Sequence, residues 1–70
     1  MEDWKERFKI EYYELRERFS KLEYMVSKYE KGTLEFKPNC PIDLLEAQLS
    51  TMHNYLWILQ ERAKLEGIQL

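Results

Sequence analysis

Few residues in this chain could perform covalent chemistry. It has one cysteine, Cys40, one histidine, His53, and two glycines, each expected at the end of a helix. A cysteine nucleophile needs a base brought to it by the fold, and a zinc ion needs several Cys or His ligands at regular spacing. The sequence also lacks a glycine-rich phosphate loop. It therefore predicts neither an enzyme nor a metal site, and it indicates no cofactor.

A tyrosine with cationic neighbours offers a different chemistry, which is the binding of an anionic aromatic ligand. Lys9 precedes Tyr13 by four residues and Arg16 follows it by three, so the three side chains share one surface of a helix. The ring can stack on a base while the cations meet its phosphates. We therefore predict a nucleotide-binding cluster of Lys9, Tyr13 and Arg16.

Tyr24 forms a competing cluster with Lys21 and Lys28. The sequence does not rank this cluster against the one at Tyr13. In both places the charges could equally be solvated and paired along the helix with neighbouring carboxylates at three- and four-residue spacing, namely Glu6, Glu14, Glu17 and Glu23.

These clusters require a long first helix, and residues 2–31 predict one. The stretch contains no glycine or proline, and Gly32 follows it as the expected cap. Its apolar residues recur at alternating spacings of four and three, which is one heptad seam: Phe8, Tyr12, Leu15, Phe19, Leu22, Val26 and Tyr29. Tyr12 thus belongs to the core, while its neighbour Tyr13 faces elsewhere.

A linker over residues 32–40 and a second helix over 41–66 complete the predicted hairpin. We expect Leu34 and Phe36 to pack on the hairpin or on a neighbouring subunit, because their alternation puts both on one face. Pro41 is expected as the first helical residue, with Asn39 or Cys40 as its cap. The second seam has the same spacings: Ile42, Leu45, Leu49, Met52, Leu56, Leu59 and Ala63. The predicted fold is an all-α, antiparallel two-helix hairpin, one domain over residues 1–70.

The chain carries more apolar residues than two seams can bury. Ile10, Tyr13 and Tyr24 lie off the first seam, and a further stripe follows the second helix at Leu44, Tyr55, Ile58 and Leu65. A chain of 70 residues buries only about 60% of the surface it exposes when unfolded, and one cysteine permits no internal disulfide. The stripe therefore predicts an oligomer interface and a homo-oligomeric helical bundle.

Charge and hydropathy narrow the classes of partner. The net charge is −2, whereas binding to duplex DNA or RNA needs a net basic face. No run of about 18 apolar residues is present, and the first 20 residues have no apolar signal core. We expect a cytoplasmic protein with a reduced Cys40 and with no nucleic-acid polymer or membrane as its partner.

Two stretches together resemble a known family. The first, "EYYELRERFSKLEYMV", has the arrangement E-x-x-x-L-x-x-R-x-x-K-L, and the second, "LLEAQLSTMHNYLWILQERA", has Q-x-x-x-M-x-x-Y-x-x-x-L-x-x-R. This pattern is similar to that of short phage-encoded helical proteins, some of which are anti-defence sponges. Those relatives sequester the cyclic oligonucleotide signals of the bacterial CBASS system. Arg18, Lys21, Tyr55 and Arg62 match the family pattern.

The resemblance implies a compact homo-oligomer, such as a hexamer, that binds signal nucleotides between its subunits. The expected ligand is a cyclic di- or trinucleotide or a cyclic ADP-ribose-like signal, which the protein holds without cleaving it. Two other functions stay open. The chain could be an oligomeric adaptor that binds and inhibits a host protein, or a structural coiled-coil protein without a ligand.

Overall fold

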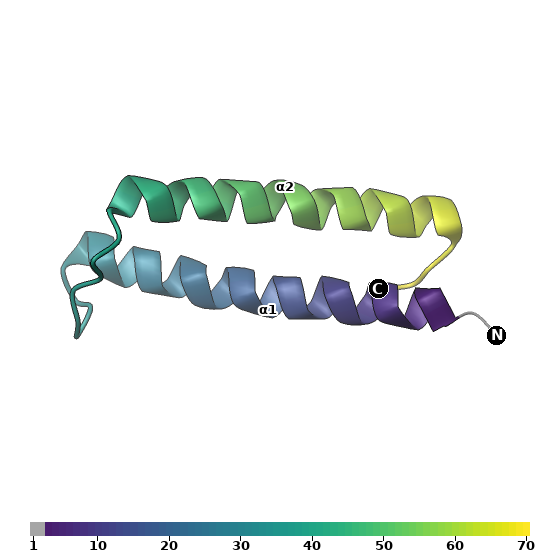
Figure 1. Cartoon of the computed structure of the whole chain (residues 1–70), viewed down its shortest axis with the longest axis horizontal. Coiled ribbons are helices and arrows are strands. Elements are labelled where there is room, and N and C mark those ends of the chain that lie inside the picture. The colour runs from purple at the N-terminus through teal and green to yellow at the C-terminus, as the bar shows by residue number, and fades with distance from the viewer. Residues whose placement is uncertain (1–2) are drawn as a thin grey trace.

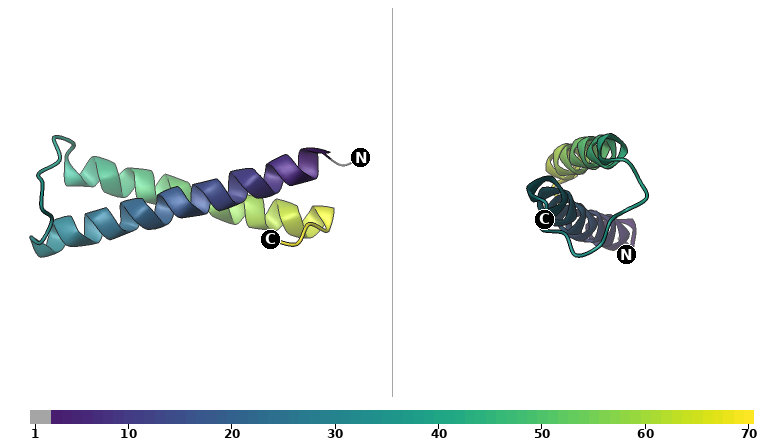
Figure 2. Two further views of the ribbon diagram at one scale, coloured as in Figure 1. Left: turned by 90° about the horizontal axis from the view of Figure 1, so that it is seen from below. Right: turned by 90° about the vertical axis from the view of Figure 1, so that its left-hand side faces the viewer.

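Two helices form the hairpin in a computed structural model that describes residues 3–70: α1 spans Asp3–Lys31 and α2 spans Ile42–Glu66 (Figure 1). They run antiparallel, so the start of α1 and the end of α2 lie at the same end of a rod measuring 48 × 17 × 17 Å. Figure 2 shows that the helices cross at a shallow angle, as they do when three-residue and four-residue ridges interlock. The predicted all-α hairpin is confirmed.

The ends of α1 follow from its charges and from one glycine. Asp3 and Glu6 lie in its first turn and Lys28 and Lys31 in its last, where each sign complements the helix dipole. Gly32 then takes a positive φ of 72°, which only glycine adopts without strain. Its N–H donates to the Tyr29 carbonyl at 3.1 Å, and the next N–H donates to the Lys28 carbonyl at 3.0 Å. These two bonds are a Schellman cap and end the helix.

The start of α2 differs from the prediction by one residue. Pro41 is the N-cap and not the first helical residue, with an extended φ of −62° and ψ of 148°. Its carbonyl accepts bonds from the N–H groups of Leu44 and Leu45 at 3.2 and 3.3 Å. The expectation that Asn39 or Cys40 caps the helix is wrong, because the cap position is taken by a residue without a capping side chain.

The end of α2 brings the tail of the chain back onto the core. Gly67 has a φ of 69° and donates to the Lys64 carbonyl at 3.3 Å, while the Ile68 N–H donates to the Ala63 carbonyl at 2.8 Å. This second Schellman cap reverses the chain, and the Ile68 side chain is buried as a result. The two heptad seams did not predict that contact, because Ile68 lies beyond the helix.

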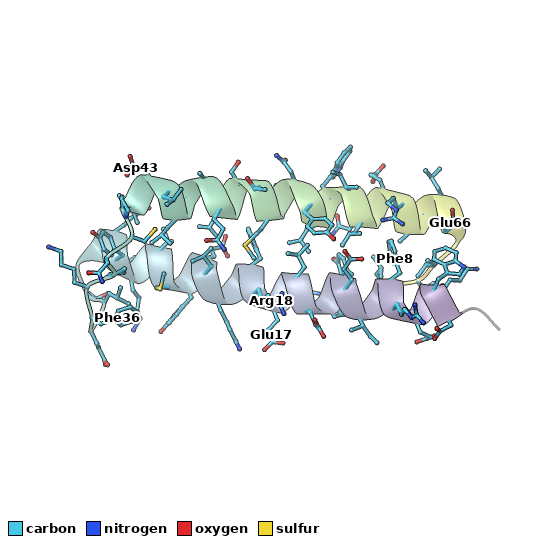
Figure 3. All side chains as sticks on the ribbon, viewed as in Figure 1. Phe8, Glu17, Arg18, Phe36, Asp43 and Glu66 are labelled. Carbon is cyan, nitrogen blue, oxygen red and sulfur yellow. The ribbon has the colours of Figure 1, made fainter. Side chains whose placement is uncertain are left out.

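Both predicted seams face each other as expected. Every one of their positions is buried or half-buried, and Phe8 points from α1 towards α2 (Figure 3). The best-packed part lies near the open end of the hairpin and comprises Phe8, Tyr12, Leu59, Ala63 and Ile68, with Leu15 and Leu56 packed against it. Val26 and Leu45 are buried nearer the linker. The core therefore lies between the two helices and is densest near the open end of the hairpin.

The linker does not place both of its apolar side chains on the hairpin. Leu34 is half-buried, but Phe36 is 59% exposed and lies outside the seam between the helices (Figure 3). Phe36 therefore does not pack on the hairpin of its own chain, and its packing on a neighbouring subunit stays a prediction. Strand-like alternation puts two side chains on one face only in an extended chain, and here residues 35 and 36 form a bend.

Leu59 should be the most sensitive position of the core. Its side chain is 0% exposed, so Leu59→Ala removes buried methyl groups and leaves a cavity. We expect the free energy of unfolding to fall by about 2–5 kcal/mol, measured by urea denaturation followed by circular dichroism. Ile10→Ala is the matched control, because Ile10 is exposed on α1 and should change stability by less than about 0.5 kcal/mol. Equal losses in the two variants would contradict this packing.

A substitution of Phe36 tests whether a neighbouring subunit covers the linker. Phe36→Ala should change the free energy of unfolding by less than about 0.5 kcal/mol, because the ring is largely solvated in one chain. A loss of about 3 kcal/mol would instead show that a neighbouring subunit covers this ring. Chemical denaturation at two protein concentrations measures both outcomes.

Candidate nucleotide-binding surface

The predicted cluster around Tyr13 lies together on the exposed side of α1. The Tyr13 side chain is 45% exposed, Arg16 is exposed and Lys9 is half-buried. The Lys9 Nζ lies 3.9 Å from the Glu6 Oε1, which is a loose pair at the surface. Within residues 3–70, Arg16 has no ion-pair partner. The cluster therefore offers a guanidinium that is free to bind an anion.

The Tyr13 ring is held in place by its neighbour. The rings of Tyr12 and Tyr13 have centroids 5.3 Å apart and planes at 78°, an edge-to-face contact. Tyr12 is itself buried in the core, and its hydroxyl accepts a hydrogen bond of 2.9 Å from the Gln60 Nε2 on α2. The adjacent tyrosines thus have different roles: Tyr12 joins the helices and Tyr13 rests on it as an ordered surface ring.

The competing cluster around Tyr24 has a different geometry. The Lys28 Nζ lies 5.0 Å from the centroid of the Tyr24 ring, within the range of a cation–π contact. Lys21 forms a 3.0 Å ion pair with Glu17. The ring is 63% exposed and has no other ring contact among the described residues. Both cations at this cluster are therefore already engaged, and one of them covers the ring.

Tyr13 and Tyr24 share one face of α1. They are eleven residues apart, which is close to three turns and roughly 16 Å along the axis. Glu17 lies between them and points away from α2 (Figure 3). The two clusters are therefore two ends of one surface, and Glu17, which pairs with Lys21 of the Tyr24 cluster, lies between the two rings.

This ion pair changes the titration of Glu17. The hydrogen bond and the charge of Lys21 hold the pKa of the Glu17 carboxyl below its ordinary value, with a smaller contribution from the charge of Arg18. A lowered pKa means that the folded helix favours the carboxylate. The pair therefore supports the helix above the ordinary pKa of a glutamate and is lost as the pH falls through the lowered pKa.

The pair can be tested by titration. In Lys21→Gln the pKa of Glu17, followed by NMR of the side-chain carboxyl, should rise towards its ordinary value. Arg18→Gln is the matched control and should raise it less, because Arg18 makes the smaller contribution. Equal shifts in the two variants would show that Lys21 does not form the specific contact.

Two features near the cluster were not predicted from the sequence. Gln60 flanks the second seam, and only the register of the two helices reveals that it meets Tyr12. A polar hollow lies between the start of α1 and the returning tail and is lined by Lys5, Glu6, Lys9, Gly67, Ile68 and Gln69. It depends on the reversal at Gly67, which places the tail beside Lys9.

The predicted interface stripe is exposed in a single chain. Leu44, Tyr55, Ile58 and Leu65 all lie on the surface of α2, and Leu65 is 87% exposed. Neither α1 nor α2 is long and apolar enough to cross a membrane. From Asp3 to Leu70, no group of three or more His, Cys, Asp or Glu residues is placed to hold a metal ion.

Comparison with known proteins gives one result. The model of a family described as Sequestin matches residues 2–65, which is most of the chain. No curated protein and no solved structure matches this chain. The family name refers to sequestration, which is a binding role, and no enzyme family is indicated.

Proposed function

Because the chain belongs to the Sequestin family, we propose that it binds a cyclic nucleotide signal and sequesters it without cleaving it. The proposed ligand class is a cyclic di- or trinucleotide or a cyclic ADP-ribose-like molecule, and the proposed setting is phage defence against host immunity, in the cytoplasm of the infected cell. The family name supports sequestration, and the resemblance of both helices to anti-CBASS sponges supports the ligand class.

The observation that carries this proposal is the ordered Tyr13 ring between two cations. A nucleotide needs a flat ring for its base and positive charge for its phosphate. The edge-to-face contact with Tyr12 orders the ring before the ligand arrives, so little side-chain freedom is lost on binding. Arg16 can then meet a phosphate in a bidentate, charge-assisted contact. These features favour the Tyr13 cluster over the one at Tyr24.

Binding without turnover fits the placement of the two reactive side chains. Cys40 lies in the linker, whereas His53 lies about three turns into α2, where its ring contacts Phe19 at 6.1 Å between centroids. A nucleophile and its base must lie within hydrogen-bond reach. Cys40 and His53 therefore do not form a catalytic pair.

Ligand binding can be tested with a nucleotide panel. Cyclic di- and trinucleotides and cyclic ADP-ribose isomers are each added to the protein, and the melting temperature is followed. We expect one ligand class to raise it, because a ligand that binds only the folded state stabilises that state. The ligand should be recovered intact on chromatography. No shift with any member would favour the alternative function, an adaptor that inhibits a host protein.

The site itself is tested by substitution, with the panel member that gives the largest shift. Tyr13→Ala should weaken binding at least about tenfold, because one base–aromatic stack is worth about 1–3 kcal/mol. Tyr13→Phe should bind nearly as well as the original chain, since stacking needs the ring and not the hydroxyl. Tyr24→Ala is the matched control on the same face. A larger loss from Tyr24→Ala, or unchanged binding by Tyr13→Ala, would refute the assignment.

A further inference from the structure

α2 carries a second heptad seam, which is exposed to solvent, whereas the first is packed against α1. We call it the outer seam: Leu44, Gln48, Thr51, Tyr55, Ile58, Arg62 and Leu65. Its spacings alternate between four and three along the whole helix, as the buried seam's do. All seven residues are exposed in a single chain. Such a period is what a helix needs to pack along a second partner helix.

The outer seam is more apolar than a solvated helix face. Four of its seven residues are large apolar side chains, and Arg62 is its only charge. The Arg62 guanidinium makes a cation–π contact with the Phe8 ring, whose centroid lies 4.9 Å away. The Thr51 hydroxyl donates to the Ala47 carbonyl at 3.0 Å, so its hydrogen is used within the helix. By contrast, the exposed side of α1 carries ion pairs such as Lys21–Glu17.

The outer seam is also symmetric about Tyr55. Leu44 and Leu65 lie about equally far from Tyr55 along the helix, and the same is true of Gln48 with Arg62 and of Thr51 with Ile58. Two antiparallel copies of α2 related by a two-fold axis at Tyr55 would bring each of these pairs together. An interface of this kind must be self-complementary, and the seam meets that condition.

The shape of the surface agrees with this register. Leu65 is 87% exposed and is the most exposed large apolar side chain of the described chain. A hollow of mainly apolar surface lies at the other end of the seam, lined by Leu44, Ala47, Gln48, Thr51 and Met52. In an antiparallel register the hollow of one copy would lie opposite Leu65 of the other, which would fill it.

We propose that the outer seam is a two-fold interface between two copies of this chain, with the α2 helices antiparallel and Tyr55 at the axis. The contact makes a four-helix bundle with the α2 helices inside. Tyr13 and Tyr24 lie well off the seams on α1, so the interface leaves their surface free. The proposal therefore stands independently of the nucleotide ligand.

Cysteine cross-linking tests the register in a Cys40→Ser background. Tyr55→Cys should form a disulfide-linked dimer with itself, because the two copies of this position meet at the axis. Leu44→Cys and Leu65→Cys should cross-link when mixed with each other and not when oxidised alone. Self-linking of both end variants would indicate parallel helices and overturn the proposal, as would the absence of any cross-link.

Light scattering tests whether the outer seam is the surface through which two copies associate. The original chain should have a mass of at least twice 8.7 kDa at micromolar concentration, and Ile58→Asp should reduce it to 8.7 kDa. Trp57→Asp is the matched control, because Trp57 is similarly exposed but rotated by about 100° out of the outer seam. Circular dichroism checks that both variants stay helical. A monomeric original chain, association that survives Ile58→Asp, or association lost in Trp57→Asp would each overturn the proposal.

Discussion

The structure depends on one contact, the strip of apolar side chains between α1 and α2. Neither helix is stable alone, because most helical stability in proteins comes from packing of an apolar face, and an isolated helix has nothing to pack against. With a single cysteine the chain has no internal disulfide, and residues 3–70 form no further helix or strand against which α1 and α2 could pack. Leu59, fully enclosed among Phe8, Tyr12, Ala63 and Ile68, lies at the centre of this contact. Everything on the outer surface is positioned by it.

The tyrosine pair shows how this core reaches the surface. Tyr12 is fixed twice, by burial and by the hydrogen bond from Gln60 on the opposite helix. Tyr13 is in turn fixed by its contact with Tyr12. The position of the Tyr13 ring, which we propose meets the ligand, thus depends on the register between α1 and α2. Tyr24 lacks such a neighbour and instead holds Lys28 over its own ring.

Periodicity explains what could be predicted from the sequence and what could not. The heptad spacings predicted both seams, since they depend only on the regular turn of a helix. The cluster of Lys9, Tyr13 and Arg16 was predictable for the same reason, because all three lie on one helix. Contacts between elements were not: the Gln60 hydrogen bond needs the register of the two helices, and the burial of Ile68 needs the reversal at Gly67. The bend at Phe36 breaks the alternation that suggested burial.

The uneven distribution of the core has a consequence for the order of folding. Val26 and Leu45 are both buried near the linker, so packing of the two helices there closes a short loop, whereas the cluster of Phe8 with Leu59 closes a much longer one. Closing the longer loop directly costs roughly 0.9 kcal/mol more in chain entropy. We therefore expect the hairpin to zip from the linker towards the chain ends, so that its best-packed cluster forms last. The chain ends therefore stay together only while this cluster remains packed, and its loss would let the two helices separate from their open end.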